Sequence, residues 1–156
     1  MAMITPLNPR EFFTGKWIGK GIFQLHGIFH LLIPDQSIEY IGQTKWITDE
    51  FWISIEEFNL SQSGSTNRTT YIKRNGEKSL HTTCDDIVGG ADIHLRENGF
   101  SHDPYLFRSP MGKGFIIVKC HDNAILQENG TLHDQIKMYY AGLHIATTNI
   151  EINIFR

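Results

Sequence analysis

Two side chains near the C-terminal end of the sequence, Asp134 and His144, are of the types that perform acid–base chemistry. Asp134 alternates in step with Leu132 and Ile136, and His144 in step with Ala146, so both are expected on the apolar face of a strand. A carboxylate and an imidazole that meet there could act as a general-base pair, each shifting the pKa of the other. Asp134 could instead orient a His144 that binds haem iron, or His144 could lie exposed at a strand entrance. We assign neither a catalytic residue nor a cofactor from this pattern.

Arginines offer a second kind of chemistry. Arg68, Arg108 and the acidic Asp86 lie in or beside strand-like segments. An arginine that points into a barrel can hold a carboxylate, because its planar guanidinium donates two parallel hydrogen bonds to that group. An arginine on the outer face would be an ordinary cross-strand charge, whose ion pairs contribute little to stability. Both interpretations are open for each arginine.

A zinc site is the third possibility, since His81-x-x-Cys84 and Cys120-His121 together supply two thiols and two imidazoles. Residues three apart or one apart point to opposite faces of a regular strand, so only a bulge could bring each pair together. A free cysteine usually behaves as a small buried apolar side chain. We therefore predict no metal site.

Large apolar side chains in the same segments would line the inside of a closed sheet. Such a lining fills a small barrel completely, or surrounds a ligand cavity when the barrel has more strands. The candidates for this lining are Phe23, Leu25, Phe29, Tyr40, Trp46, Met138 and Tyr140.

A short helix and a long strand are predicted at the start of the chain. Asn8 can cap the helix, Pro9 suits its first position, and Glu11 lies three residues after the cap. From Trp17 to Leu31 apolar residues and glycines occupy every odd position, which predicts one long strand with one buried face.

The same alternation returns later in the chain, in residues 38–46, 132–140 and 146–154. Asn-Gly, a strong signal for a hairpin turn, occurs at residues 75–76, 98–99 and 129–130. Strands with one apolar face must either stack as two sheets or close into a barrel. Glycines at 19, 21 and 27 favour the barrel, because glycine relieves crowding where a strand bends. We predict an all-β fold with about nine or ten strands, in a single antiparallel barrel domain over residues 1–156 with a short N-terminal helix.

Composition excludes several partners. The 14 Lys and Arg against 17 Asp and Glu give a net charge of −3, which does not favour binding to nucleic acid. The longest apolar stretch, residues 27–33, is far shorter than the roughly 20 residues of a membrane-spanning helix. Residues 1–6 lack the features of a signal peptide, and two cysteines suit a reducing compartment, so we expect a cytoplasmic protein.

The segment Phe13-Thr14-Gly15-Lys16-Trp17 resembles the opening of lipocalin-related (calycin) barrels, in which a helical turn leads through G-x-W into the first strand. The tryptophan of such barrels plugs the closed end. Glu57-Phe58, the turn residues 61–64 and Arg68 resemble the acidic-aromatic, turn and arginine sequence of a bacterial lipocalin-like family of unknown function.

Two later segments extend this resemblance. Residues 86–91 resemble the D-[IV]-[IV]-G-x-A segment of that family, and residues 121–154 resemble its closing strands. This chain departs from the family at Gly90, where a larger residue is usual, and in lacking the leader of the members that look like secreted lipoproteins. The resemblance implies a lipocalin-like barrel and makes Arg68 the preferred candidate for binding an acidic group. It implies no settled activity.

Three functional hypotheses follow. In the first, the barrel binds a small apolar or amphipathic molecule, with Arg68 or His144 as its polar partner. In the second, the same cavity is an isomerase or hydrolase site that uses Asp134 and His144. In the third, a filled barrel is an interaction module, which exposed aromatic patches would support.

Overall fold

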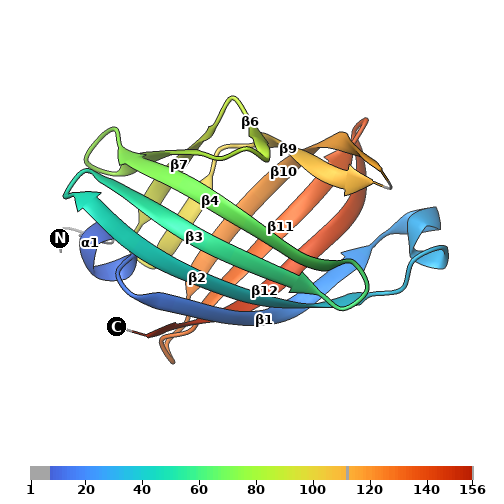
Figure 1. The fold of residues 1–156 in the computed structure, drawn as a ribbon, viewed down its shortest axis with the longest axis horizontal. Helices are drawn as coiled ribbons and strands as arrows, with labels where there is room; N and C mark the ends of the chain where they lie inside the picture. Colours follow the sequence, from blue (N-terminus) through green and yellow to red (C-terminus); the bar gives the residue numbers. More distant parts are fainter. Residues whose placement is uncertain (1–7, 112, 156) are drawn as a thin grey trace.

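Ten antiparallel strands close into a barrel in the computed structural model, which describes residues 8–111 and 113–155 (Figure 1). Around the barrel the strands follow the order β11, β12, β1, β2, β3, β4, β5, β7, β8 and β10, and β10 pairs with β11 to close it. Strand β9 pairs with Gly114–Cys120 of β10, on the same edge of β10 that pairs with β8 through Asn123–Ile125, and β6 pairs with β9, so these two continue the wall beyond β8. The all-β barrel predicted from the sequence is confirmed. The predicted absence of a leader concerns residues 1–6, which lie outside the described residues.

The elements in chain order are α1 (Pro9–Phe12), β1 (Lys16–Leu25), the 3-10 helix η1 (Gly27–Leu31), β2 (Gln36–Thr48), β3 (Phe51–Leu60), β4 (Gly64–Arg74), β5 (Ser79–Thr83), β6 (Ile87–Val88), β7 (Ala91–Arg96), β8 (Gly99–His102), β9 (Tyr105–Met111), β10 (Gly114–Leu126), β11 (Leu132–Tyr140) and β12 (Leu143–Phe155). Each of the three Asn-Gly pairs lies at or beside a turn between consecutive paired strands, as predicted.

One end of the barrel is closed by aromatic rings. Helix α1 covers this end (Figure 1), and Asn8 caps the helix by accepting a hydrogen bond from the backbone N–H of Arg10 at 3.0 Å. The ring of Phe13 stacks on Trp17 with centroids 5.3 Å apart, and it also packs against Trp52 and Phe100. Trp52 is fully buried. The predicted plug at the start of β1 is therefore present.

The first strand is shorter than the alternating pattern predicts. β1 ends at Leu25, and residues 27–31 form η1 instead of continuing the strand. Gly27 adopts a φ of +63°, a left-handed conformation that interrupts the regular alternation of a strand interior. Phe29 consequently lies on η1, 38% exposed, and not on an inward strand face. The prediction of a strand through Leu31 is wrong for this reason.

The opposite end of the barrel is open to solvent. Along the paired strands β3 and β4, Trp52 and Ile72 face each other and are buried at the closed end. The equivalent pair at the other end, Phe58 and Thr66, is partly buried and exposed respectively. Inward side chains thus become accessible toward one end, which we call the mouth of the barrel.

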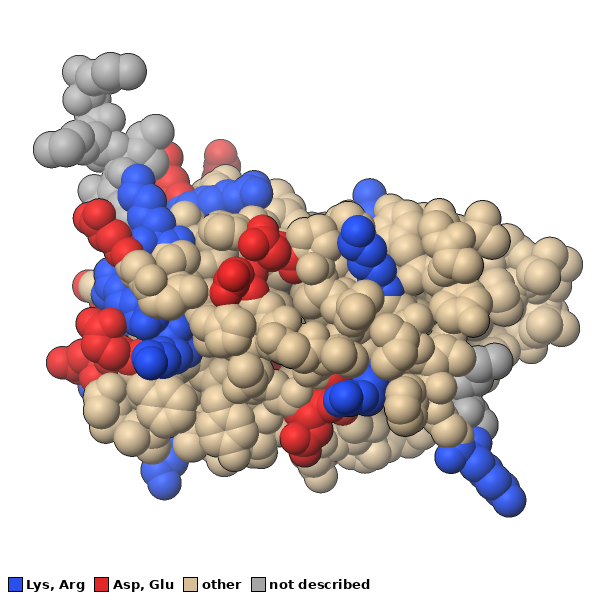
Figure 2. Space-filling model, turned by 90° about the horizontal axis from the view of Figure 1, so that it is seen from above, with Lys and Arg blue, Asp and Glu red and all other residues tan. Residues whose placement is uncertain are grey.

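Few charged side chains lie around the mouth on the face that Figure 2 shows. Figure 2 shows Lys, Arg, Asp and Glu gathered mainly over the half of the barrel near the N-terminus, and few charges at the other end. On η1, beside the mouth, Ile28 is 71% exposed and Leu31 83% exposed. Within the described residues, no helix combines the length and apolar character needed to cross a membrane.

Candidate functional site

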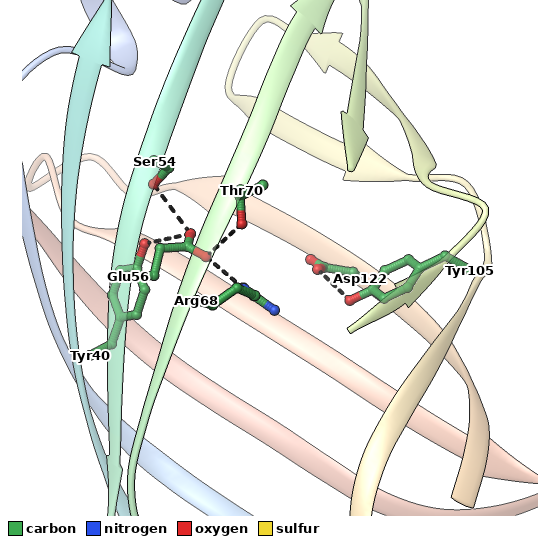
Figure 3. A network of polar contacts seen from close by, with 7 residues as sticks. All are labelled: Tyr40, Ser54, Glu56, Arg68, Thr70, Tyr105 and Asp122. Atoms are coloured by element: carbon green, nitrogen blue, oxygen red, sulfur yellow. Dashed lines mark hydrogen bonds and ion pairs between the residues drawn. The ribbon is translucent and has the colours of Figure 1, made fainter. Parts of the chain in front are cut away.

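A largely buried ion pair between Glu56 and Arg68 forms the centre of a polar network on the inner wall. The two residues face each other across β3 and β4, and the Arg68 Nε donates to Glu56 Oε2 at 2.7 Å. Thr70 donates to the same oxygen at 3.0 Å, while Tyr40 donates to Oε1 at 3.1 Å. Figure 3 shows this network, which also includes Ser54. The carboxylate therefore accepts hydrogen bonds on both oxygens, as a buried charge requires.

Glycine at position 42 makes room for part of this network. Gly42 lies opposite Glu56 in the β2–β3 pair. A Cβ atom at Gly42 would lie 2.4 Å from the Tyr40 hydroxyl, so any side chain there would displace the group that reaches Glu56. Burial, and next the charge of Glu56, raise the pKa of Tyr40 well above its ordinary value. Tyr40 therefore remains a neutral hydrogen-bond donor.

Arg68 has donor groups that the network does not use. Its Nε is the only nitrogen of this side chain with a hydrogen-bond partner among the described residues, and 22% of the side chain is accessible. Burial, the largest single effect, lowers the pKa of Arg68, but the charge and hydrogen bond of Glu56 together with the nearby Cys84 and Tyr105 raise it overall. The guanidinium points from β4 toward Asp122 and Tyr105 on the opposite wall (Figure 3). The two terminal NH2 groups of the charged guanidinium therefore face the interior.

The opposite wall has a second polar cluster around Asp122, whose side chain is 8% exposed. The Tyr105 hydroxyl donates to Asp122 Oδ2 at 3.2 Å. His102 Nδ1 lies 3.3 Å from the same oxygen without the geometry of a hydrogen bond. Burial raises the pKa of Asp122, but His102 and hydrogen bonds from Asp134 and Tyr105 have the larger effect and lower it. Asp122 is therefore the ionised member of the cluster.

Asp134 is the neutral partner of Asp122. It belongs to β11 and lies diagonally across from Asp122 of β10, since Asp134 pairs with Ala124. Burial, the Asp122 charge and a hydrogen bond to Asp122 together raise the pKa of Asp134 well above its ordinary value. Two carboxyl groups in contact hold one proton between them, because both cannot be ionised so close together.

The structure separates Asp134 from His144. A register shift in the β11–β12 pair lies at Met138 and Tyr139, so His144 pairs with Tyr139. Its ring packs on Tyr139 at a centroid distance of 5.0 Å and on His26 at 4.4 Å. Tyr139 lines a groove of about 330 Å³ on the outer wall. The expectation that His144 points into the barrel is wrong, because the extra residue at this register shift turns the His144 side chain to the outer face.

The other predicted lining residues are spread along the barrel. Tyr40 joins the Glu56 network, and Met138 packs against the buried cluster that contains Val118 and Cys120. Trp46 packs on Trp52 at the closed end, with a centroid distance of 4.4 Å. Three residues lie toward the mouth, namely Phe23 and Leu25, partly buried, and Tyr140, 48% exposed.

The amino-acid sequence over residues 3–154 matches the family described as "Protein of unknown function (DUF3833)". This chain belongs to the DUF3833 family. No curated protein matches it. Among solved structures, the S-type phycobiliprotein lyase CPES from Guillardia theta is similar in fold, with a TM-score of 0.59 at 8% sequence identity. The alignment covers 99% of this chain and 96% of the lyase chain. The predicted lipocalin-like barrel from a family of unknown function agrees with these findings at this level.

Sequence reasoning missed several polar residues of this DUF3833 barrel. Glu56 shares inward alternation with Trp52 and Phe58, and Asp122 shares it with Cys120 and Ala124. A charged residue in an apolar alternation is the signal that could have identified both. The remaining missed members, Ser54, Thr70, His102 and Tyr105, carry no such signal.

A metal site has no support within residues 8–111 and 113–155. No group of three or more His, Cys, Asp or Glu side chains there is arranged to hold a metal ion. Cys84 and Cys120 are free cysteines, and His81 bonds to Asp92 at 2.7 Å instead of approaching either thiol. Arg108, the second arginine considered from the sequence, donates to the backbone carbonyl of Asp85.

The shared proton should make stability depend on pH. The pKa of Asp134 is raised by folding, so above about pH 4 the native state binds more protons than the unfolded state. The free energy of unfolding then falls as pH rises toward the raised pKa. Asp134→Asn removes this dependence, and the stability of the variant relative to the wild type should rise with pH by up to about 1.4 kcal/mol per unit. Urea unfolding at several pH values measures the difference.

Asp49→Asn is the matched control, because the Asp49 side chain is 92% exposed. The lowered pKa of Asp122 acts in the other direction, and its stabilising effect is lost only as pH falls below about 4. Measurements above that pH therefore isolate Asp134. A pH-independent difference between Asp134→Asn and the wild type would contradict the shared proton.

Proposed function

We propose that this protein binds a small amphipathic organic acid inside the barrel, with Arg68 as the partner of the acid group. The observation that carries the proposal is the pair of Arg68 terminal N–H groups that face the interior without a partner among the described residues. The Glu56 carboxylate holds the guanidinium at Nε, so these groups are already oriented. A planar fork of two N–H donors matches a carboxylate.

The surroundings of Arg68 suit the apolar part of such a ligand. The Phe58 ring lies beneath the guanidinium at 4.9 Å and is partly buried on the side of the mouth. Phe23 and Leu25 are likewise partly accessible near this end. Few charged side chains surround the mouth on the face that Figure 2 shows, and the exposed apolar side chains of Ile28 and Leu31 lie beside it. The likeness to the phycobiliprotein lyase concerns the fold and identifies no ligand for this chain.

The enzyme hypothesis has no Asp134–His144 pair to support it. The two residues lie apart along β11 and β12, and His144 bonds to Thr147 and the Ala146 carbonyl. We also infer a cytoplasmic location, which the free Cys84 and Cys120 support.

Two probes with the same aromatic body test the proposal. We expect the wild type to bind 1-naphthylacetate about tenfold or more tightly than the neutral 1-naphthalenemethanol, measured by calorimetry. The double variant Glu56→Gln, Arg68→Met removes both buried charges and should lose this preference while still binding the alcohol. Asp49→Asn, Arg10→Met is the control, since it removes an exposed ion pair of 3.2 Å.

Equal affinity of the wild type for both probes would contradict the proposal, as would a preference that the Glu56→Gln, Arg68→Met variant retains. Native mass spectrometry of the purified protein gives an independent check. A stoichiometric bound molecule with an acidic group would support Arg68 as its partner, and a bound molecule without one would contradict it.

A further inference from the structure

Two buried carboxyl oxygen atoms on the inner wall receive no hydrogen bond from an N–H group or a hydroxyl of the described residues. Oδ1 of Asp122 and Oδ1 of Asp134 are buried and have no hydrogen-bond partner among the described residues. Both atoms are acceptors when ionised, so the contact between the two carboxyl groups needs a hydrogen between them. Buried polar atoms without a protein partner are uncommon and are frequent at functional sites.

The carboxyl groups of Asp122 and Asp134 have few positively charged groups around them. Arg68 approaches from β4, but its Nε is committed to Glu56 of β3. His102 of β8 contacts only the Asp122 side of the pair. No ion pair involves Asp134 in the described part of the chain. Its other titratable neighbours are Glu56 of β3, Tyr40 of β2 and Tyr105 of β9, and none of them is a cation.

We propose that Asp122 and Asp134 form a subsite for the basic nitrogen of a ligand, which takes the place of the proton that the two carboxyl groups share. The inference rests on the proposed ligand-binding function and names a second chemical group of the ligand. A protonated amine or amidine suits the subsite, because it offers several N–H donors and one positive charge.

The position of Asp134 permits this contact. Asp134 is partly accessible, unlike Asp122, and its side chain shares the inner face with Ile136 and Met138. The Arg68 guanidinium points toward the same wall, so one molecule with an acid and a basic nitrogen could contact both groups (Figure 3).

Binding at this subsite releases a proton. The ligand enters as an ammonium ion, Asp134 gives its proton to solvent, and the ammonium ion then donates N–H bonds to two carboxylates. Charge is conserved, since one cation enters the site and one proton leaves it. The number of protons released is obtained from binding enthalpies in two buffers of different ionisation enthalpy.

Calorimetry with 1-naphthylmethylamine and the neutral 1-naphthalenemethanol tests the subsite. We expect the wild type to bind the amine about tenfold or more tightly, with about one proton released per amine and none per alcohol. Asp134→Asn should abolish the proton release and weaken the preference, because only the Asp122 carboxylate then remains to accept from the amine. Asp49→Asn, which removes an exposed carboxylate, should leave both unchanged.

The wild-type measurements test the subsite even if the Asp134→Asn variant fails to fold. Equal affinity for amine and alcohol, or amine binding without proton release, would overturn the subsite. The neutral alcohol is the reference ligand for both the amine and the acid. Failure of the subsite can therefore be distinguished from failure of the proposed function. If the acid retains its Arg68-dependent preference while the amine shows none, the acid-binding function stands and the basic-nitrogen subsite is wrong.

Discussion

Replacing Arg68 with Met should lower the free energy of unfolding by about 3–5 kcal/mol, the cost of leaving a buried carboxylate without its cation. The Glu56 side chain is 12% exposed and that of Arg68 is 22% exposed, so water reaches the remaining charge poorly. Hydrogen bonds from Tyr40 and Thr70 remain in the variant, but neither neutralises the charge. Chemical denaturation at neutral pH measures the loss.

The double variant Glu56→Gln, Arg68→Met should recover most of that stability. Replacing both members of a buried pair removes the uncompensated charge, and the new amide oxygen can still accept from Tyr40 or Thr70. A double variant as unstable as Arg68→Met alone would show that packing of the Arg68 side chain, and not its charge, determines the loss. This recovery also makes the double variant suitable for the binding experiments.

Replacing Trp52 with Ala should lower the free energy of unfolding by about 3–5 kcal/mol as well, but through a cavity. The Trp52 side chain is fully buried, and its ring contacts Trp46 at a centroid distance of 4.4 Å and Phe13 at 5.6 Å. The closed end of the barrel depends on these contacts. Thermal or chemical unfolding measures the effect.

Trp52→Phe keeps an aromatic ring at this position but removes the indole N–H. The Trp52 Nε1 is buried without a hydrogen-bond partner in the described part of the chain, so a phenyl ring removes no bond. We expect this variant to lose less than half as much stability as Trp52→Ala. Similar losses in both variants would indicate that the shape of the indole is essential to the plug.

Local patterns account for the parts of the fold that were predicted correctly. Alternation over residues 38–46, 132–140 and 146–154 lies within β2, β11 and β12. The cap at Asn8 is confirmed for a similar reason, since it depends on a few neighbouring residues. Strand alternation and turn chemistry act over short distances, and the sequence carries them directly.

Two failures show where local pattern is insufficient. The left-handed φ of Gly27 ends a strand whose alternation continues to Leu31. The register shift beside Tyr139 turns His144 away from the interior. In the first case the chain leaves the sheet, and in the second one extra residue places His144 on the opposite face from Ala146, because side chains alternate with a period of two.

The sequence by itself determined that this protein is an antiparallel barrel with a tryptophan plug, and it singled out Arg68 and Asp134. Only the tertiary structure decided which groups accompany them. Glu56 reaches Arg68 because β3 and β4 pair in one register, and Asp122 reaches Asp134 because β10 pairs with β11 when the barrel closes. These partners are separated by about a dozen residues in the chain and meet only through strand pairing, which depends on the closure of the whole sheet.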